Sequence, residues 1–253
     1  MKTATILKGI YALWYREFKV FTREKSRVIS SVFMPLFWYF IFGYGIGSIA
    51  SVGGGVNYHY FIFPGFLAMT IIFTGLFNGA YVVWDKKIDF LKEVLISPLS
   101  RTTIFAGKML GGSTDALLQA CILLVLGLIV GVPFTFAGIL LTIATLCIFA
   151  AGLVSLGLII GSFMESPEGY GMVASFAVYP MFLLSGAFYP SDRLPGWLRV
   201  LTFIDPGTYA VDGLRSIIIG VSTFSFATDI LILLAFDVVF IAIGTWAFNR
   251  MKL

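Results

Sequence analysis

Charged residues are scarce in this sequence and are absent from long stretches of it. Only 12% of the 253 residues are charged and 59% are hydrophobic, whereas soluble domains average about 25% charged and about 45–50% apolar residues. No Lys, Arg, Asp or Glu occurs in residues 28–84 or 116–164. A helix needs about 20 apolar residues to cross about 30 Å of hydrocarbon, so each tract has room for two crossings. These absences exclude a soluble globular domain and predict an all-α polytopic membrane protein.

Cysteine and histidine are also rare. Cys121 and Cys147 fall inside apolar runs, where a thiol behaves as a small hydrophobic group, so we predict neither a disulfide framework nor a metal site. The single histidine, His59, has no evident partner, whereas a membrane-embedded enzyme needs a polar cluster of nucleophile, base or metal ligands. The phosphate-binding pattern G-x-x-x-x-G-K-[ST] does not occur either. We therefore expect no catalytic residue, metal or cofactor in this chain.

The N-terminal segment is amphipathic when it is placed on a helical wheel. Lys8, Arg16, Lys19 and Arg23 share one face, and Glu17 alone interrupts the other, which carries Ile6, Ile10, Leu13, Trp14, Phe18, Val20 and Phe21. Helices of this kind lie in the membrane surface, with their rings among acyl chains and their cations against anionic headgroups. We predict an interfacial helix and a cytoplasmic N-terminus in residues 1–27, and a soluble helix packed on a domain is the alternative.

Six membrane spans are predicted within one permease-sized domain that covers residues 1–253. Glycine, proline or charged residues separate them, and the gap from residue 189 to residue 224 is the longest. The six-span bundle occupies residues 28–248 and is followed by a short cytoplasmic tail, residues 249–253. The expected spans are residues 28–49, 59–82, 104–130, 138–163, 169–188 and 226–248.

The distribution of Lys and Arg predicts the orientation, because positive residues near the ends of spans stay on the cytoplasmic side. With both termini inside, fourteen of the 17 Lys and Arg residues lie on the cytoplasmic side. The three on the outer side are Arg193, Arg199 and Arg215. We therefore expect a multi-pass protein of the plasma (cell inner) membrane with both termini and the loop at residues 85–108 in the cytoplasm.

The stretch IDFLKEVLISPLSR, residues 88–101, brings charge back between two apolar tracts. Asp89 is placed to cap a short helix that Pro98 ends. Its apolar edge would hold Phe90, Leu91, Val94 and Leu95, with Lys92 and Glu93 pointing elsewhere. A small apolar surface ringed by charge at the tip of two spans fits a groove on another protein. An ordinary interfacial loop helix is the alternative interpretation.

Two stretches resemble a known family. IDFLKEVLISPLSR closely resembles the cytoplasmic loop of type-2 ATP-binding cassette (ABC) exporter permeases, particularly the branch of drug-resistance and nodulation-factor export subunits. FLLSGAFYPSDRLPGWLRVLTFIDPGTYAVDGLR, residues 182–215, resembles the signature before the last span of the same family. The resemblance covers essentially the whole chain in motif order, span count and length.

The resemblance implies a permease that works as a dimer of this chain with two copies of a separate ATPase, which would hold ATP and Mg. It also implies that a loop helix docks in a groove of the ATPase, beside the N-terminal segment. Membrane lipids are the other expected partner, and nucleic acid is not. The turn at residues 165–168 is a weaker candidate for the same contact, and a simple tight turn is its alternative. The predicted coupling residues are Asp89, Phe90, Leu91, Lys92, Glu93, Val94, Leu95 and Ile96.

The long gap before the last span carries two predicted helices. Leu194, Trp197, Leu198 and Leu201 follow helical spacing, and Asp205 with Pro206 reads as the start of a second helix that runs towards Ile219. By resemblance these are re-entrant helices that close the pathway on the outer side. The residues assigned to this gate are Trp197, Asp205, Tyr209 and Arg215. A surface connector anchored by Trp197 is the alternative.

Three polar side chains lie within predicted spans. Asp115 and Gln119 are four residues apart and share a helix face, and Asp237 lies near the middle of the last span. Such groups usually face protein or water rather than lipid, because an ionisable group at that depth costs about 2.5–3.5 kcal/mol. They are candidates for the pathway or an interface. Asp115 could instead reach the cytoplasmic surface, and Asp237 could be protonated, bonded within the bundle or exposed to the pathway.

The predicted function is export of an amphipathic or lipid-linked compound, driven by the separate ATPase. Export of a polysaccharide or a lipid-linked glycan is the alternative within the family. An ion-coupled transporter or channel is the alternative of another class, although only Asp237 supports it. Aromatic residues, 17% of the chain, crowd the first two spans and either stack on a substrate or serve packing and membrane anchoring.

Overall fold

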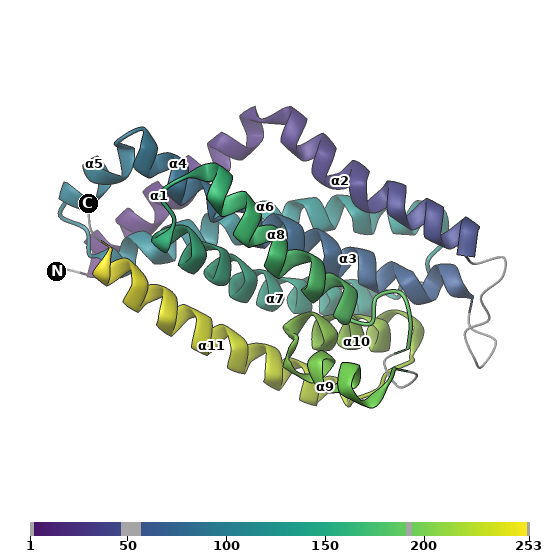
Figure 1. Ribbon diagram of the computed structural model, residues 1–253. Coiled ribbons are helices and arrows are strands. Elements are labelled where there is room, and N and C mark those ends of the chain that lie inside the picture. The colour runs from purple at the N-terminus through teal and green to yellow at the C-terminus, as the bar shows by residue number, and fades with distance from the viewer. Residues whose placement is uncertain (1–2, 47–56, 191–193, 252–253) are drawn as a thin grey trace.

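The computed structural model describes residues 3–46, 57–190 and 194–251, and every regular element in these ranges is a helix. Both termini and the short helix α5 lie at one end of an elongated bundle, while α9 and α10 lie towards the other end (Figure 1). The prediction of an all-α polytopic membrane protein is confirmed. The elements are α1 (Thr3–Arg23), α2 (Lys25–Phe40), the π-helix η1 (Ile41–Ile46), α3 (Tyr58–Phe77), α4 (Ala80–Lys87), α5 (Phe90–Ile96), α6 (Arg101–Val130), α7 (Phe136–Phe163), α8 (Pro167–Leu184), α9 (Gly196–Ile204), α10 (Pro206–Ile219) and α11 (Phe226–Arg250).

Among the described residues, four segments are long and apolar enough to cross a membrane, namely residues 58–87, α6, α7 and α11. Two shorter helical segments, α2 with η1 and α8, correspond to the predicted first and fifth spans, and residues 47–49 of the first lie outside the described residues. The second span is longer than predicted, because α4 continues α3 after a turn at Asn78 and Gly79. Gly79 is required there, since a Cβ atom would lie 2.0 Å from the carbonyl oxygen of Gly157 in α7.

Local sequence fixes most helix ends. Gly131 and Gly220 end α6 and α10 with φ of 87° and 70°, a conformation that glycine adopts without steric cost. At four helix starts a hydroxyl accepts a hydrogen bond from the backbone N–H three residues later, which satisfies a donor that the helix leaves open. These N-caps are Ser100, Thr135, Ser166 and Ser225.

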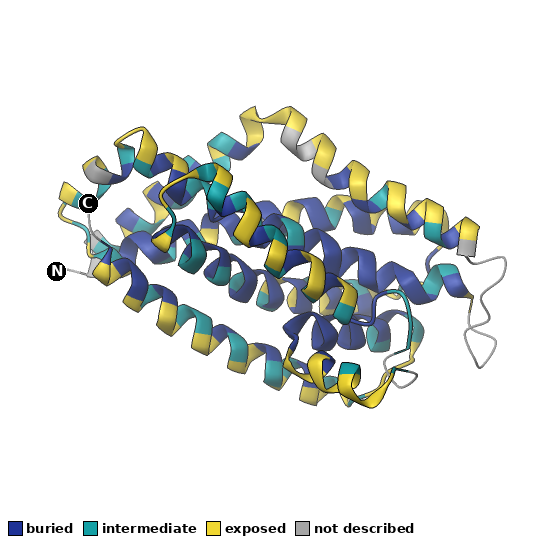
Figure 2. Ribbon diagram, viewed as in Figure 1, coloured by how far each residue is buried: buried dark blue, intermediate teal, exposed yellow. Residues whose placement is uncertain are grey.

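The core of the bundle is built around α3. Most of its residues are buried, and it packs against α2, α6, α7, α8 and α10. The outer helices α2, α8 and α11 have long exposed faces (Figure 2), and much of this exposed surface is apolar, as at Phe33, Phe176 and Val238. Exposed apolar faces of this extent are those that lipid or another membrane protein covers.

The N-terminal helix packs on the protein itself. Gly107 and Gly111 of α6 let the backbone approach α1, and their Cα atoms face Leu13 and Glu17. Leu13, Glu17 and Phe21 are buried, while Lys8 and Lys19 on the opposite face are exposed. The predicted basic face is therefore present, but part of the predicted apolar face covers α6.

Candidate functional site

Four charged side chains form a buried cluster at the end of the bundle that carries α5. Lys108 of α6 donates to Glu17 of α1 over 3.1 Å and to Asp85 of α4. Arg16 donates to the same two carboxylates, each over 2.8 Å. Lys108 is almost completely buried, so its charge is balanced inside the protein by these carboxylates. The charge cluster, Arg16, Glu17, Asp85 and Lys108, ties three helices together.

Arg16 also connects the charge cluster to α5. Its guanidinium carbon lies 3.9 Å from the centre of the Phe90 ring, a cation–π contact between α1 and the first residue of α5. One residue later, Leu91 enters a hydrophobic cluster with Phe105 of α6 and Phe248 of α11. α5 is therefore fixed on its inner side to α1, α6 and α11.

The structure divides the predicted coupling residues into an inner and an outer set. Leu91 is 1% exposed, and Val94 and Leu95 are half-buried against the same hydrophobic cluster. Ile96 is 80% exposed and Ile88, just before the helix, is 64% exposed; Glu93 is exposed too. Most of the predicted apolar edge thus faces the protein, and the apolar groups at the outer surface are Ile88 and Ile96. The side chain of Lys92 lies outside the described residues.

Asp89 occupies the N-cap position of α5 as predicted, but its side chain makes no capping hydrogen bond, so that part of the prediction is wrong. Its backbone is left-handed, with φ of 59°. Asp tolerates this conformation better than most residues with a side chain. Asp89 therefore contributes by turning the chain sharply between α4 and α5.

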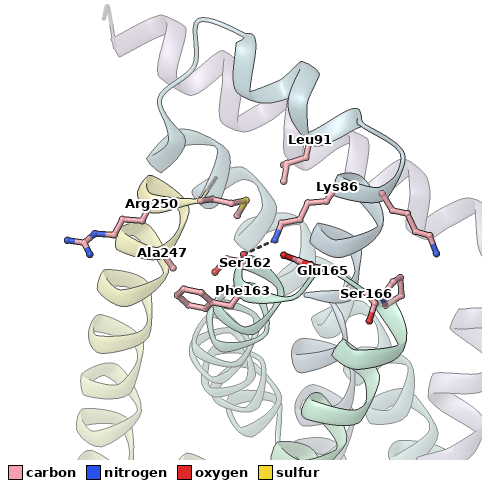
Figure 3. A pocket seen from close by; sticks show the side chains of 11 residues that line it. Lys86, Leu91, Ser162, Phe163, Glu165, Ser166, Ala247 and Arg250 are labelled. Carbon is pink, nitrogen blue, oxygen red and sulfur yellow. Dashed lines mark hydrogen bonds between the residues drawn. The ribbon is translucent and has the colours of Figure 1, made fainter. Parts of the chain in front are cut away.

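Two cations near α5 hold the ends of neighbouring helices. The Lys86 ammonium donates to the carbonyl oxygens of Gly161, Ser162 and Met164 at 2.7–3.1 Å, where α7 ends, and Figure 3 shows this side chain reaching towards Ser162. Arg101 donates to three carbonyl oxygens at the end of α11, the closest at 2.7 Å. The last carbonyls of a helix have no partner within it, so these cations stabilise both ends. Lys86 thereby joins α4 to the end of α7, just before the turn at residues 165–168.

Three of the four predicted gate residues come together around α10. Asp205 caps this helix by accepting from the Gly207 N–H over 2.9 Å. Tyr209 donates its hydroxyl proton to the carbonyl of Phe203 over 2.8 Å. Arg215 donates to the Gly186 carbonyl over 2.9 Å and lies 3.8 Å above the Phe61 ring. All three are buried, because α10 packs against α3, α7, α8 and α11.

The fourth predicted gate residue, Trp197, lies apart from them. It is 70% exposed on α9, where Val200 and Ile204 are also exposed. The two helices of this segment therefore differ: α10 is an internal element, whereas α9 presents apolar side chains outward. Arg193, predicted to lie on the outer side, falls outside the described residues.

Asp115, Gln119 and Asp237, the three polar residues singled out within the predicted spans, are all buried. Asp115 stays inside the bundle, so the alternative in which it reaches the surface is not observed. Gln119 accepts from the Thr74 hydroxyl over 2.8 Å. Asp237 lies between α11 and α7, where a Cβ on Gly152 would be 2.2 Å from its carboxylate oxygen. Among the described residues, no group of three or more His, Cys, Asp or Glu side chains could hold a metal ion.

An aromatic cavity of about 660 Å³ opens between α2, α3 and α8. Gln119 stands in its wall, and the Gln119 amide nitrogen has no hydrogen-bond partner there. Of the described residues that line the cavity, none is charged. The lining residues are Ser30, Met34, Pro35, Phe37, Trp38, Phe42, Met69, Phe73, Thr74, Phe77, Gln119, Tyr179, Phe182, Leu183 and Phe188.

Sequence reasoning missed the charge cluster, although two signals pointed to it. Glu17 was the one residue that broke the apolar face of the N-terminal helix, and Lys108 followed seven residues after Arg101 inside an apolar helix. Each looked like an isolated exception. Their pairing depends on the packing of α1 on α6, which no local pattern reveals.

Comparison with known proteins gives one matching family model, described as ABC-2 type transporter, over residues 8–219. The chain is 27% identical to the "Inner membrane transport permease YadH" of Escherichia coli over 92% of this chain and 91% of that protein. It is 32% identical to the "Probable multidrug ABC transporter permease YbhR" of the same organism over 62% of this chain and 43% of that protein.

Proposed function

The chain belongs to the ABC-2 type transporter family, and we propose that it is the membrane subunit of an exporter driven by ATP hydrolysis on a separate nucleotide-binding subunit. It acts as a permease and not as the ATPase, so ATP and Mg²⁺ are held by that partner. The name of the relative YadH supports an inner-membrane location. The positions of Lys and Arg support cytoplasmic termini. The narrower drug-resistance and nodulation-factor branch remains a prediction.

One observation carries the proposal: α5 combines an exposed tip with a firmly held inner side. Glu93 and Ile96 of α5 form the exposed tip, with Ile88 also exposed just before the helix, and an ATPase groove can receive this surface. On the other side Phe90 contacts Arg16 of the charge cluster, and Leu91 is packed in the core. A force applied to the tip is therefore passed to α1, α6 and α11 rather than lost in a mobile loop.

A second copy of this chain is the proposed partner within the membrane. The aromatic cavity opens between α2 and α8, whose neighbouring surfaces expose Phe33, Phe37, Met172 and Phe176. A single copy leaves the cavity open at this side. Two copies that face each other through α2 and α8 would enclose one shared pathway, and two ATPases would then drive the pair.

The lining of the aromatic cavity supports an amphipathic cargo over a glycan. A sugar chain needs many hydrogen-bonding groups, because each buried hydroxyl without a partner costs free energy. The cavity offers rings and aliphatic groups, and the lining side chains that carry a polar atom are Ser30, Trp38, Thr74, Gln119 and Tyr179. Aromatic compounds with few polar atoms match this surface better.

Copurification of the ATPase tests the proposal. We expect Ile96→Asp to reach the membrane in normal amounts but to lose most of the accompanying ATPase, because a new charge in an apolar groove costs several kcal/mol unless it is paired. Val221→Asp, an exposed apolar residue at the opposite end of the bundle, is the matched control and should retain the partner. Full retention of the ATPase by Ile96→Asp would refute docking through α5.

A further inference from the structure

A second cavity, of about 620 Å³, lies at the α5 end of the bundle and is separate from the aromatic cavity. Figure 3 shows Leu91 above it, Lys86, Ser162 and Glu165 in its wall, and Ala247 and Arg250 of α11 at one side. Its boundaries are thus α4 and α5, the turn between α7 and α8, and the last turn of α11. We call it the basic pocket, lined by Lys86, Lys87, Leu91, Ser162, Phe163, Glu165, Ser166, Pro167, Ala247, Arg250 and Met251.

The charges of the basic pocket favour an anion. Three cationic side chains line it, Lys86, Lys87 and Arg250, against the single carboxylate of Glu165. The Lys86 ammonium is occupied by three carbonyl oxygens, so it supplies a fixed positive charge. Lys87 and Arg250 are exposed, and in Figure 3 Arg250 reaches outward from the rim. These two are the side chains available to an incoming ligand.

Each of the two available cations lies over a tryptophan of its own helix. The Lys87 ammonium is 5.2 Å from the Trp84 ring, and the Arg250 guanidinium is 4.7 Å from the Trp246 ring. Both tryptophans are about half exposed. Tryptophan together with Lys or Arg is typical of the level at which lipid headgroups meet the protein. The basic pocket therefore opens at the membrane surface.

The rest of the basic pocket is apolar and continues into apolar helix faces. Phe163 is 59% exposed at its floor. Further along the bundle, α11 exposes Val239 and Ile243, and α8 exposes Met172 and Phe176. A ligand that fits this surface has an anionic head and long apolar chains.

We propose that the basic pocket binds the phosphate headgroup of an anionic glycerophospholipid. Lys87 and Arg250 contact the headgroup, and the acyl chains lie along α8 and α11. Basic pockets between helices at the cytoplasmic side suit such headgroups, because that leaflet carries anionic lipid. The bound lipid would connect α4 and α5 to the end of α11, which places it beside the coupling surface. This inference rests on the proposed orientation, with α5 at the cytoplasmic side, and does not depend on the cargo or the ATPase.

Native mass spectrometry of the purified full-length protein tests the inference. The protein is equilibrated with equal amounts of dioleoyl phosphatidylglycerol and dioleoyl phosphatidylethanolamine, and the retained lipids are counted. We expect the unaltered protein to prefer phosphatidylglycerol and the double variant Lys87→Gln/Arg250→Gln to retain about tenfold less of it, since hydrogen bonds to charged groups are the stronger kind. The charge-conserving double variant Lys87→Arg/Arg250→Lys should retain it. Lys25→Gln/Arg199→Gln removes two exposed cations that lie outside both the basic pocket and the basic face of α1, and should change retention by less than about twofold.

Four results would overturn the assignment. Equal loss in the Lys25→Gln/Arg199→Gln control would mean diffuse attraction to acidic lipid, and equal retention of the two lipids would mean that the basic pocket does not distinguish headgroup charge. Displacement of phosphatidylglycerol by excess inorganic phosphate would assign the basic pocket to a soluble anion. Unchanged lipid retention with loss of the copurifying ATPase in Lys87→Gln/Arg250→Gln would assign it to the protein partner.

Discussion

Lys108 is the residue on which the charge cluster depends most. It is buried and contacts both Glu17 and Asp85. Lys108→Met would leave these carboxylates without their closest cation, and removing one partner of a buried ion pair typically costs about 3–5 kcal/mol. We expect a clear fall in the midpoint of thermal unfolding of the purified protein.

The matched control for that substitution is Lys8→Met, which removes an exposed lysine from the same α1–α6 region. Its midpoint should stay close to that of the unaltered protein, because exposed ion pairs contribute about 0–1 kcal/mol. Adding Asp85→Asn to Lys108→Met should recover part of the lost stability. Equal midpoints for Lys108→Met and Lys8→Met would mean that the charge cluster does not hold the helices together.

Gln119 provides a directed hydrogen-bond donor in the aromatic cavity. Its amide oxygen accepts from Thr74 and its buried amide nitrogen has no partner, so we expect this nitrogen to donate to the acceptor of a bound ligand. The planar ketone 9-fluorenone has such an acceptor, and fluorene has the same ring system without it. We expect Gln119→Leu to weaken fluorenone binding about two- to tenfold, the value of one hydrogen bond, and to leave fluorene binding unchanged.

Equilibrium dialysis against protein-free micelles measures both affinities. Phe73→Ala, which removes a ring from the wall, should weaken both compounds together and so separates stacking from hydrogen bonding. If Gln119→Leu lowers the two affinities equally, the amide does not contact the ligand.

At the scale of elements, the sequence predicts where helices begin and end better than which way they face. The predicted short helix after Asp89 coincides with α5, because its turn residues and Pro98 act locally. Which side chains of α5 face outward was not predictable from local sequence. Leu91 faces inward because it joins a hydrophobic cluster that includes Phe105 and Phe248, from helices distant in the sequence.

Labelling of introduced cysteines tests directly whether α10 lies inside the bundle. Val211 and Leu214 are fully buried, whereas Ser222 lies in the exposed connection before α11. In a background with Cys121→Ala and Cys147→Ala, we expect cysteine at 211 or 214 to react with a membrane-impermeant maleimide far more slowly than cysteine at 222. Similar labelling of all three positions in intact cells would indicate that α10 lies on the surface.

At the scale of the whole molecule, the charge cluster and α5 form one mechanical unit. The Arg16 side chain of α1 contacts both the Phe90 ring of α5 and the Asp85 carboxylate of α4, so it joins these three helices. Lys108 extends this unit into α6, which also carries Gln119 in the wall of the aromatic cavity. α6 therefore links the proposed ATPase-docking surface to the proposed pathway.

The overall architecture was largely predictable because hydropathy and the residues that start and end helices are local properties of the sequence. Long apolar tracts predicted the four helical segments of the described residues that are long and apolar enough to cross a membrane, and the two motif stretches predicted the family that the comparison confirms. The aromatic cavity and the basic pocket were not predictable. Each is made by side chains from several helices, as when Lys86 of α4 meets the end of α7.

Photo-crosslinking at α5 tests the central claim most directly. A benzoylphenylalanine residue is placed at position 96, which is exposed on α5, or at position 221 as the control at the other end. On irradiation of the assembled complex, the account predicts a covalent adduct between position 96 and the ATPase and none at position 221. An ATPase that remains in the complex but forms no adduct at position 96 would contradict it.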